Sequence, residues 1–246
     1  GIPAWRSGAI YAEGTLVNVE RSRFIGNSAG SIGYGGAIFT GTMNAVNCIF
    51  KDNYAAYGAA FEGASDVSGT VNVTNCAFVN NHSVTGGSIV DYLGTWNDRN
   101  CIYYGNHCDA SGGQQCFSEM SNVYINYSDL QADSWSAPLM YGNIFIDNST
   151  SLEPKFVNPS SDLHLSGGSP CIDTGTLQGV SSPDLDGNPR VRGFNVDMGP
   201  YEFMGPSIRI VYPNGGEILT AGGFHPITWE VNPWATATNI TLSTNE

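Results

Sequence analysis

The stretch that decides the fold is Gly35-Gly36-Ala37-Ile38 followed by Phe50-Lys51-Asp52-Asn53, a tetrad of small residues and then an aromatic residue with asparagine three positions later. This pair of phrases occurs four times. The tetrads are Ser7-Gly8-Ala9-Ile10, Gly35-Gly36-Ala37-Ile38, Gly58-Ala59-Ala60-Phe61 and Gly86-Gly87-Ser88-Ile89, and their partners are Phe24…Asn27, Phe50…Asn53, Phe78…Asn81 and Tyr103…Asn106. Successive aromatic residues are 26, 28 and 25 positions apart. A nearly constant period indicates a repeated structural unit with insertions in its loops.

The segment before each aromatic residue alternates in character. Val46, Cys48 and Phe50 follow one another at intervals of two positions. The same two-residue interval separates Cys76 from Phe78 and Cys101 from Tyr103. Period-two alternation predicts a strand with one buried face. A repeat of about 25 residues cannot close a core alone, so successive repeats must stack at roughly 4.8 Å per coil. The sequence therefore predicts an all-β fold, a parallel β-solenoid that is right-handed by the usual crossover chirality.

In such a stack, equivalent side chains of consecutive coils lie above one another. Three internal columns are expected: aromatic Phe24, Phe50, Phe78 and Tyr103, amide Asn27, Asn53, Asn81 and Asn106, and thiol Cys48, Cys76 and Cys101. Side-chain amides can donate and accept hydrogen bonds from rung to rung, and asparagine tolerates the left-handed backbone of a sharp corner. We expect the glycines at similarly tight corners.

Composition narrows the class of protein. The chain has 246 residues, 31 of them glycine, and only 13% are charged, which favours short strands and tight turns over helices. The formal net charge is -13 and the basic residues are scattered, so a nucleic-acid partner is not expected. No run is long enough to span a membrane. The acidic balance and the sequons at Asn72, Asn81, Asn126, Asn148 and Asn239 suit an extracellular or cell-surface protein.

The tetrads and the aromatic-to-asparagine phrases resemble the repeats of bacterial polymorphic outer-membrane proteins. These are surface adhesins and autotransporter passengers with right-handed β-helix folds of the pectin-lyase-like superfamily. The resemblance covers about residues 7–106, and residues 122–128 and 145–148 continue it in degraded form. It implies a rigid, surface-displayed rod.

Residues 153–203 resemble the closing module of secreted bacterial β-helix proteins that carry a variable C-terminal anchor. The resemblance rests on five phrases, namely Glu153-Pro154-Lys155-Phe156-Val157-Asn158-Pro159, Asp162-Leu163-His164-Leu165, Ser169-Pro170-Cys171-Ile172-Asp173-Thr174-Gly175, Asp184-Leu185-Asp186-Gly187-Asn188-Pro189-Arg190 and Val196-Asp197-Met198-Gly199-Pro200-Tyr201-Glu202-Phe203. It implies that the solenoid and this module form one domain over residues 1–203.

A short hinge at 204–206 precedes a last segment, 207–246. Its Pro213-Asn214-Gly215-Gly216-Glu217 and Ile227-Thr228-Trp229 phrases resemble the start of an immunoglobulin-like sandwich. About 40 residues make roughly half a sandwich, which cannot close two sheets. We expect this partial module to be completed by more chain, by the solenoid or by a neighbouring molecule.

The cysteines leave several interpretations open. The column at Cys48, Cys76 and Cys101 suits buried thiols that act as small apolar side chains, a disulfide between adjacent rungs, or a metal site. No histidine lies at ligand spacing within the column, and His107 beside Cys108 is an isolated pair. Cys108 and Cys116 flank a glycine-containing loop and indicate a local disulfide in an oxidising compartment.

One segment resembles part of a calcium loop. In Asp184-Leu185-Asp186-Gly187-Asn188, the side chains of Asp184, Asp186 and Asn188 offer alternating oxygen ligands and Gly187 allows the bend. The distal bidentate glutamate is missing, and the same residues suit an ordinary turn in which aspartate bonds its own backbone. No other cofactor is expected.

Right-handed β-helices include many polysaccharide lyases and hydrolases, so this family resemblance raises the question of catalysis. A lyase needs a basic residue, and Arg21, Arg23 and Lys51 of adjacent coils form either such a cluster or a solvated face. A hydrolase needs two carboxylates at a fixed separation. Candidate carboxylates are Asp91, Asp98 and Asp109, near an irregular coil rich in aromatic residues. None of these sets meets the geometric roles that catalysis requires.

Two functions remain as hypotheses. The first is a non-catalytic structural or adhesive protein that associates with itself, through an uncovered first coil, or with neighbouring surface proteins, into a filament or sheath. The second is a module that binds or degrades polysaccharide through Tyr92, Trp96, Tyr103 or Tyr104. Tyr103 cannot serve both hypotheses, because the repeat assigns it to the buried column.

Overall fold

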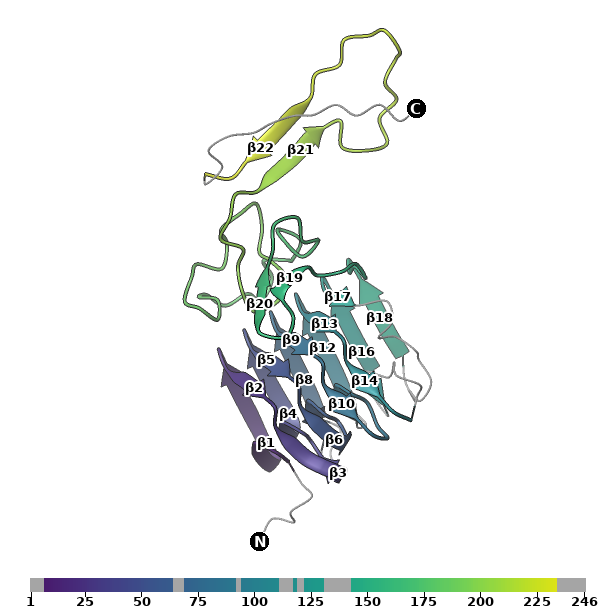
Figure 1. Cartoon of the computed structure of the whole chain (residues 1–246), viewed down its shortest axis with the longest axis vertical. Helices are drawn as coiled ribbons and strands as arrows, with labels where there is room; N and C mark the ends of the chain where they lie inside the picture. The colour runs from purple at the N-terminus through teal and green to yellow at the C-terminus, as the bar shows by residue number, and fades with distance from the viewer. Residues whose placement is uncertain are drawn as a thin grey trace.

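The structure is a computed structural model that describes residues 7–63, 69–91, 94–110, 117–118, 122–130 and 143–233. Over these ranges the chain is all-β and forms a parallel β-solenoid of about four coils (Figure 1). Each coil adds strands to three sheets, which enclose one core. The described part contains no helix that is long and apolar enough to cross a membrane.

The strands of the described residues fall into three parallel sheets. The large sheet contains β1 (Ile10–Glu20), β4 (Ile38–Val46), β7 (Phe61–Glu62), β8 (Gly69–Thr74), β11 (Val90–Asp91), β12 (Gly94–Arg99), β15 (Phe117–Ser118), β16 (Asn122–Asn126) and β18 (Asn143–Asp147). The second sheet contains β2 (Arg23–Ile25), β5 (Ile49–Lys51), β9 (Ala77–Val79), β13 (Ile102–Tyr104) and β17 (Asp129–Leu130). The third sheet contains β3 (Ser28–Tyr34), β6 (Tyr54–Tyr57), β10 (His82–Ser83) and β14 (His107–Cys108).

The aromatic column runs through the core beside the second sheet. Phe24, Phe50, Phe78 and Tyr103 are successive partners in the strand register. Their ring centroids are 5.0 Å apart at each step, and the interplanar angles are 7°, 4° and 5°. This is the arrangement that the repeat spacing predicts, and the three later rings are fully buried.

The asparagine ladder lies in the core at the junction of the second and third sheets. The Nδ2 atom of each of Asn27, Asn53 and Asn81 donates to Oδ1 of the asparagine in the next coil at 2.9 Å. Asn106 ends the ladder. The amide groups of Asn53, Asn81 and Asn106 also donate to the carbonyl oxygen of the aromatic residue one coil earlier, at 2.8–3.0 Å. The ladder therefore ties each coil to the main chain of its neighbour.

The expectation that ladder asparagines occupy the left-handed corners is wrong. The positive φ belongs to the residue before each of them, with 66° at Gly26, 54° at Asp52, 53° at Asn80 and 64° at Gly105. The preceding residue makes the bend, and the asparagine after it is left free to point its amide inward. The corner and the ladder are thus separate adjacent positions.

A second left-handed corner divides the segment that was expected to be one strand. β4 ends at Val46 and β5 begins at Ile49, with Asn47 between them at φ 52°. Asn75 and Asn100 occupy the same corner in the next coils, at 52° and 55°. The chain changes sheet here, so Val46 faces outward although it shares parity with the buried Cys48.

The small tetrads are required where coils approach closely. A Cβ atom on Gly36 would lie 2.2 Å from the carbonyl oxygen of Ala59 in the next coil, which only glycine avoids. Gly58 also has φ 56°, in the left-handed region. Backbone bonds such as Gly36 N–H to Gly58 O at 3.0 Å join successive tetrads.

All five cysteines in the described residues are buried free thiols. In the column, Cys48, Cys76 and Cys101 each lie within 3.2–3.4 Å of a carbonyl oxygen two residues earlier in the chain. Burial raises the pKa of the Cys101 thiol to about 11. Cys108 carries a free thiol and Cys116 lies outside the described residues, so the structure does not show the predicted disulfide.

Residues 153–203, called the closing module below after the modules that they resemble, pack on the outside of the second sheet. The module's β19 (Phe156–Asn158) and β20 (Asp162–Leu165) pair antiparallel. A second apolar cluster joins the two parts, with Ile49, Ala77, Val79 and Ile102 from the solenoid and Phe156, Leu163, Leu165, Cys171, Leu185, Met198 and Tyr201 from the module. The module is therefore held by a core of its own.

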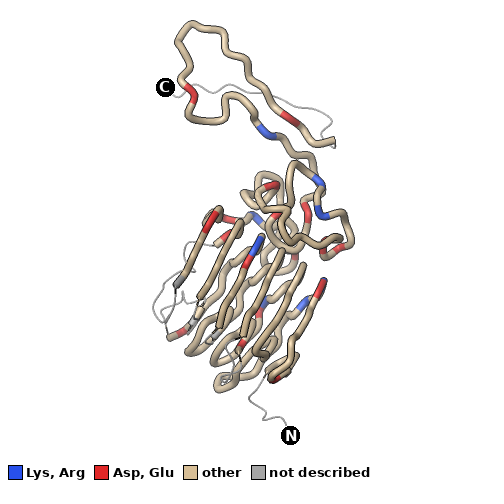
Figure 2. The backbone as a smooth tube through the Cα atoms, turned by 180° about the vertical axis from the view of Figure 1, so that it is seen from behind, with Lys and Arg blue, Asp and Glu red and all other residues tan. Residues whose placement is uncertain are grey.

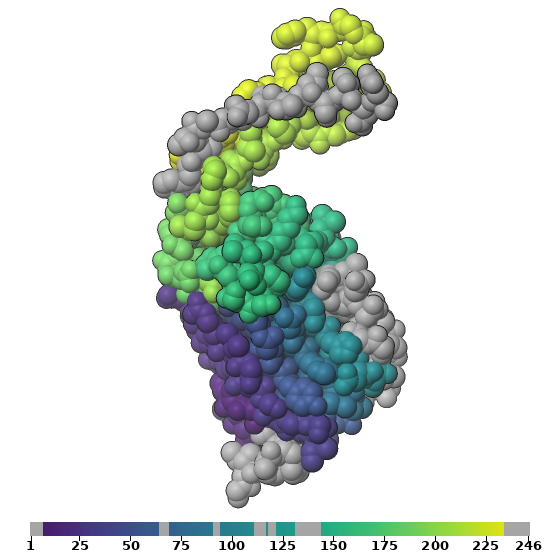
Figure 3. Space-filling view, in the orientation of Figure 1, coloured from purple at the N-terminus to yellow at the C-terminus, as the bar shows by residue number. Residues whose placement is uncertain are grey.

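Beyond the closing module, β21 (Ile208–Tyr212) and β22 (Thr228–Val231) form an antiparallel pair. Figure 3 shows this hairpin projecting away from the body of the solenoid. Side chains on both of its faces are exposed, including Ile208, Ile210 and Trp229. Within the described residues, this is one two-stranded sheet, and no second sheet packs against it.

Two rows of asparagine give a matched test of burial: the buried ladder described above, and an exposed row of Asn18, Asn44, Asn72 and Asn97 on the outward face of the large sheet. Asn81→Ala removes a buried amide and leaves the Phe50 carbonyl and the Asn53 N–H without their partner. We expect it to lower the free energy of unfolding by about 3 kcal/mol. Asn72→Ala breaks two equivalent amide contacts in solvent and should change stability by less than about 0.5 kcal/mol. Urea denaturation compares them, and equal losses would contradict this account of the ladder.

Candidate functional site

The outward face of the large sheet is flat and predominantly polar. Side chains alternate along β8, β12 and β16, so that Val71, Trp96 and Val123 enter the core while Asn72 and Tyr124 face solvent. Strand register arranges the outward residues in columns. The central column is Asn18, Asn44, Asn72, Asn97, Tyr124 and Phe145, and beside it lie Glu20, Val46, Thr74, Arg99, Asn126 and Asp147. Thr70, Thr95 and Asn122 lie on the other side.

The first four residues of the central column form a second amide ladder, the outer ladder of Asn18, Asn44, Asn72 and Asn97. Nδ2 of each later residue donates to Oδ1 of the residue in the preceding coil, at 2.9 Å in all three cases. Each bond uses one of two amide protons and one of two oxygen lone pairs. A row of oriented donors and acceptors therefore remains directed to solvent at the spacing of the coils.

Two exposed aromatic rings continue the outer ladder. Tyr124 and Phe145 stack at a centroid distance of 4.8 Å and an interplanar angle of 7°, with 37% and 48% of their surfaces exposed. Where the amides meet the rings, the face has a shallow depression of about 310 Å³. Its lining includes Asn97, Arg99 and Tyr124. The depression combines amide groups, one guanidinium and an aromatic face.

Two of the four aromatic residues that were expected to bind sugar, Trp96 and Tyr103, are buried in the core. Trp96 is completely buried, and its Nε1 donates to Oη of the equally buried Tyr103 at 3.2 Å. Tyr104 packs edge-on against Phe156 beneath the closing module. The sugar-binding prediction is wrong for Trp96 and Tyr103, because both side chains point into the core, whereas the predicted place of Tyr103 in the buried aromatic column is confirmed. Tyr92 lies outside the described residues.

The carboxylates considered for hydrolysis are not brought together. Asp98 is buried and accepts hydrogen bonds from Tyr103 Oη at 2.6 Å and from Ser128 Oγ. Burial raises the pKa of Asp98 to about 6, and these hydrogen bonds oppose the shift. Asp109 lies exposed after β14, and the side chain of Asp91 lies outside the described residues. Asp98 is part of an internal polar network that solvent does not reach.

Two members of the predicted basic cluster, Arg23 and Lys51, line one groove between the second sheet and the closing module, and each has its own acidic partner. Lys51 is buried and pairs with Asp52. Arg23 instead reaches the closing module, where its guanidinium lies 3.0 Å from Tyr201 Oη and 3.4 Å from Asp186. Arg23 therefore belongs to the contact between solenoid and module.

A groove of about 440 Å³ lies at this contact. At its edge, Nδ1 and Nε2 of His164 lie 2.5 Å from Asp162 and 2.8 Å from Asp186, and its ring stacks on Tyr201 at 3.9 Å. Burial opposes the charged imidazole, but the bonds and charges of the two aspartates prevail and raise the pKa of His164. Each charge here has a protein partner, which indicates a role in docking the module.

The predicted calcium ligands are used by the chain itself. Oδ1 of the buried Asp184 accepts the N–H groups of Asp186 and Asn188 at 3.0 and 2.7 Å. Its Oδ2 accepts the N–H of Glu202 at 3.0 Å. Gly187, at φ 96°, closes the turn. This geometry favours the ordinary aspartate turn over a calcium loop.

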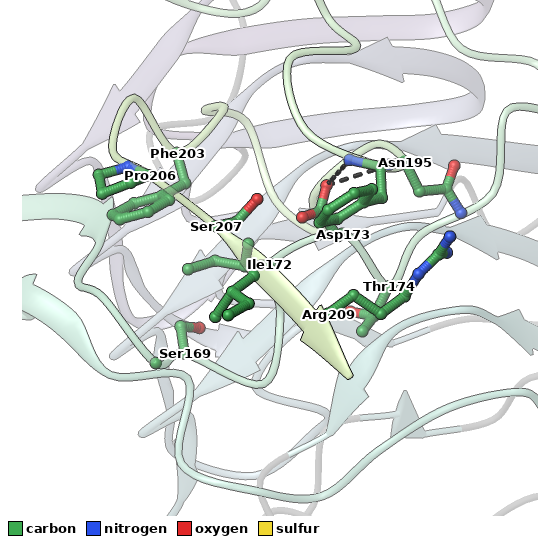
Figure 4. Close-up of a pocket in the computed structure, with 12 residues that line it drawn as sticks. Ser169, Ile172, Asp173, Thr174, Asn195, Phe203, Pro206, Ser207 and Arg209 are labelled. Carbon is green, nitrogen blue, oxygen red and sulfur yellow. Dashed lines mark hydrogen bonds between the residues drawn. The ribbon is translucent and has the colours of Figure 1, made fainter. Parts of the chain in front are cut away.

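A cavity of about 470 Å³ lies between the closing module and β21 (Figure 4). Ile172 and Phe203 give it apolar walls. Asp173 lines it, but its Oδ1 accepts the N–H groups of Phe194 and Asn195 at 2.6 and 3.0 Å. The Arg209 guanidinium covers the Phe194 ring at 4.8 Å. These contacts give the acid and the cation structural roles at the hinge.

One cluster was missed in the sequence. His82 and His107 lie on adjacent rungs of the third sheet beside Asp109. A usable signal was present, because histidine directly follows the ladder asparagine in two consecutive repeats, as Asn81-His82 and Asn106-His107. The sequence instead suggests His107 and Cys108 as a pair of metal ligands. The side chain of Cys108, however, faces the opposite way and is buried.

Comparison of this chain with profiles of protein families, with curated proteins and with solved structures finds no match.

The buried carboxyl groups predict a pH dependence of stability. Burial raises the pKa of Asp98 to about 6 and of Asp129 to about 7, above the ordinary value of about 3.9. Between these values the native state retains protons that the unfolded chain has lost. The free energy of unfolding should therefore fall as pH rises, by about 4 kcal/mol between pH 5 and pH 7.5.

Urea denaturation at the two pH values measures this difference. Asp98→Asn keeps an acceptor for Tyr103 and removes the ionisable group, so it should make the stability less dependent on pH. A wild-type protein that is more stable at pH 7.5 than at pH 5 would contradict the prediction.

Proposed function

We propose that this protein is a non-catalytic extracellular scaffold whose flat outer sheet face binds a neutral polysaccharide without cleaving it. The observation that supports this most directly is the outer ladder, which continues in register into the exposed pair Tyr124 and Phe145. Both parts lie on rigid strands whose opposite faces form the core. The surface is therefore fixed before any ligand arrives, which lowers the entropic cost of binding.

The chemistry of the face suits sugar hydroxyl groups. Planar amides can donate to and accept from neighbouring hydroxyls, and the remaining groups of the outer ladder repeat at about 4.8 Å, close to the length of one pyranose residue. The ring of Tyr124 offers an apolar surface for the C–H face of a sugar together with a polar hydroxyl. An extended glycan lying along the central column would meet the same groups at every coil.

The distribution of charge on this face favours binding over cleavage. Two columns are considered: the central column and the neighbouring column that runs from Glu20 to Asp147. The outward carboxylates in them are Glu20 on β1 and Asp147 on β18, at opposite ends of the sheet. Glycoside hydrolysis uses two carboxyl groups within about 10 Å of each other. Figure 2 shows how few Lys and Arg residues lie along the coils, which supports a neutral rather than an acidic glycan.

We further propose how the solenoid is presented at a cell surface. A right-handed coil follows from crossover chirality. The hairpin of β21 and β22 is interpreted as the first two strands of an immunoglobulin-like module, which would hold the solenoid away from a cell surface. Its exposed apolar side chains, Ile208, Ile210 and Trp229, support this interpretation because such residues are normally covered by a second sheet.

Self-association is a second candidate function, which we infer from the edge strand β1. β1 is eleven residues long and, within the described residues, pairs only with β4. A long unpaired edge is a template for another strand. Light scattering at rising concentration should show dimers and longer assemblies, and a strictly monomeric protein at high concentration would count against a filament.

The glycan proposal predicts loss of binding on substitution of the outer face. Tyr124→Ala should weaken affinity for the bound polysaccharide at least about 10-fold, because stacking on the ring is lost. Asn97→Ala should weaken it as well. Isothermal titration against a panel of neutral and acidic polysaccharides measures both effects.

A matched control is Tyr57→Ala, which removes a ring stacked on Tyr34 at 5.0 Å in the third sheet. Its affinity should equal that of the wild type. Equal affinity of the wild type and Tyr124→Ala would reject the outer face as the site. Release of reducing ends or unsaturated uronides from any polysaccharide would reject the non-catalytic function.

A further inference from the structure

Two imidazole groups and one carboxylate converge on the third sheet, away from the outer face. Nε2 of His82 lies 2.9 Å from Oδ1 of Asp109, and Nε2 of His107 lies 3.1 Å from the same oxygen. Each residue offers one ligand atom, and these atoms all lie within 4.8 Å of one another. In the part of the chain that the structure describes, this is the one such group of three.

Hydrogen bonds of the sheet fix the main chain of all three residues. The N–H groups of His82 and His107 each donate at 2.9 Å to the ladder asparagine of the preceding coil, and Asp109 N–H donates to Ser83 O at 3.0 Å. His82 and His107 are direct partners in the register of β10 and β14. Their rings lie edge to face at 5.1 Å. Only side-chain torsions remain to be set when a ligand binds.

We propose that His82, His107 and Asp109 form a binding site for a divalent transition-metal ion, with Zn²⁺ as the best suited. Two imidazole nitrogens and one carboxylate oxygen are the donors that Zn²⁺ accepts at about 2.0–2.2 Å. The ion would take the position where both Nε2 atoms now meet Oδ1. Each neutral imidazole then presents its Nε2 lone pair and carries its ring proton on Nδ1.

The choice of metal follows from the ligands. Ca²⁺ and Mg²⁺ prefer sites made wholly of oxygen, whereas imidazole suits Zn²⁺, Ni²⁺ and Cu²⁺. The side chains of His82, His107 and Asp109 are 41%, 51% and 49% exposed, so an ion can enter from solvent. Three protein ligands leave a fourth position of the tetrahedron open to water or to a group from another molecule. The net charge of -13 favours cation uptake.

The site is distinct from the proposed glycan face. The central column of the outer face lies on the large sheet, whereas β10 and β14 belong to the third sheet. Zinc binding therefore neither requires nor predicts glycan binding, and the two proposals can fail separately.

The test is titration of tag-free, chelator-treated protein with ZnCl₂ in competition with a chromophoric chelator. We expect saturable binding of one ion per chain. His82→Ala, His107→Ala and Asp109→Asn should each weaken it more than about 10-fold. His225→Ala is the matched control, because His225 is a half-buried histidine outside the cluster, and it should bind as the wild type does.

Co²⁺ substitution gives an independent measurement, since visible absorption typical of a tetrahedral nitrogen and oxygen site should appear in the wild type and disappear in His82→Ala. Urea midpoints of the variants show whether each one is folded. If a substitution does unfold the chain, perturbation of the His82 and His107 imidazole NMR signals by Zn²⁺ in the wild type decides the question. Absence of saturation by about 1 mM Zn²⁺, or unchanged affinity in folded His82→Ala and His107→Ala, would overturn the proposal.

Discussion

The structure depends on the direct superposition of equivalent residues in consecutive coils. Main-chain hydrogen bonds between parallel strands set the rung spacing, and the buried ladder of Asn27, Asn53, Asn81 and Asn106 holds the register from inside. A buried amide that loses its partner is costly, so a slip of one residue would leave several unsatisfied groups in the core at once. The ladder therefore specifies the register more strictly than the stacked rings, which tolerate sliding.

The same superposition produces the surfaces that we propose as functional. A residue type that repeats on the outside becomes a row, whether it is asparagine in the outer ladder or histidine on β10 and β14. The rows need no loops to position them, because their backbone is already fixed by the sheets. Function in this protein is thus expected on regular strands, in contrast to folds that place their sites on connecting loops.

The closing module is attached by a different kind of interaction. Its apolar cluster covers the second sheet, and the network of Arg23, Asp162, His164, Asp186 and Tyr201 lies at the rim of that contact. The aspartates hold the pKa of His164 above its ordinary value, so the charged form of the imidazole is part of the docked state. Arg23 thus contributes to holding two parts of the chain together.

The sequence by itself determined the solenoid, since a period near 26 residues and the alternation before Phe50 or Phe78 depend only on local geometry and stacking. It also identified which residues share a column. Tertiary structure decided which way the residues outside the predicted internal columns face, because left-handed corners such as Asn47 and Asn100 change the sheet and break the parity that a straight strand would keep. For that reason Trp96 became part of the core, and the meeting of His82 with Asp109 emerged only once adjacent coils were placed side by side.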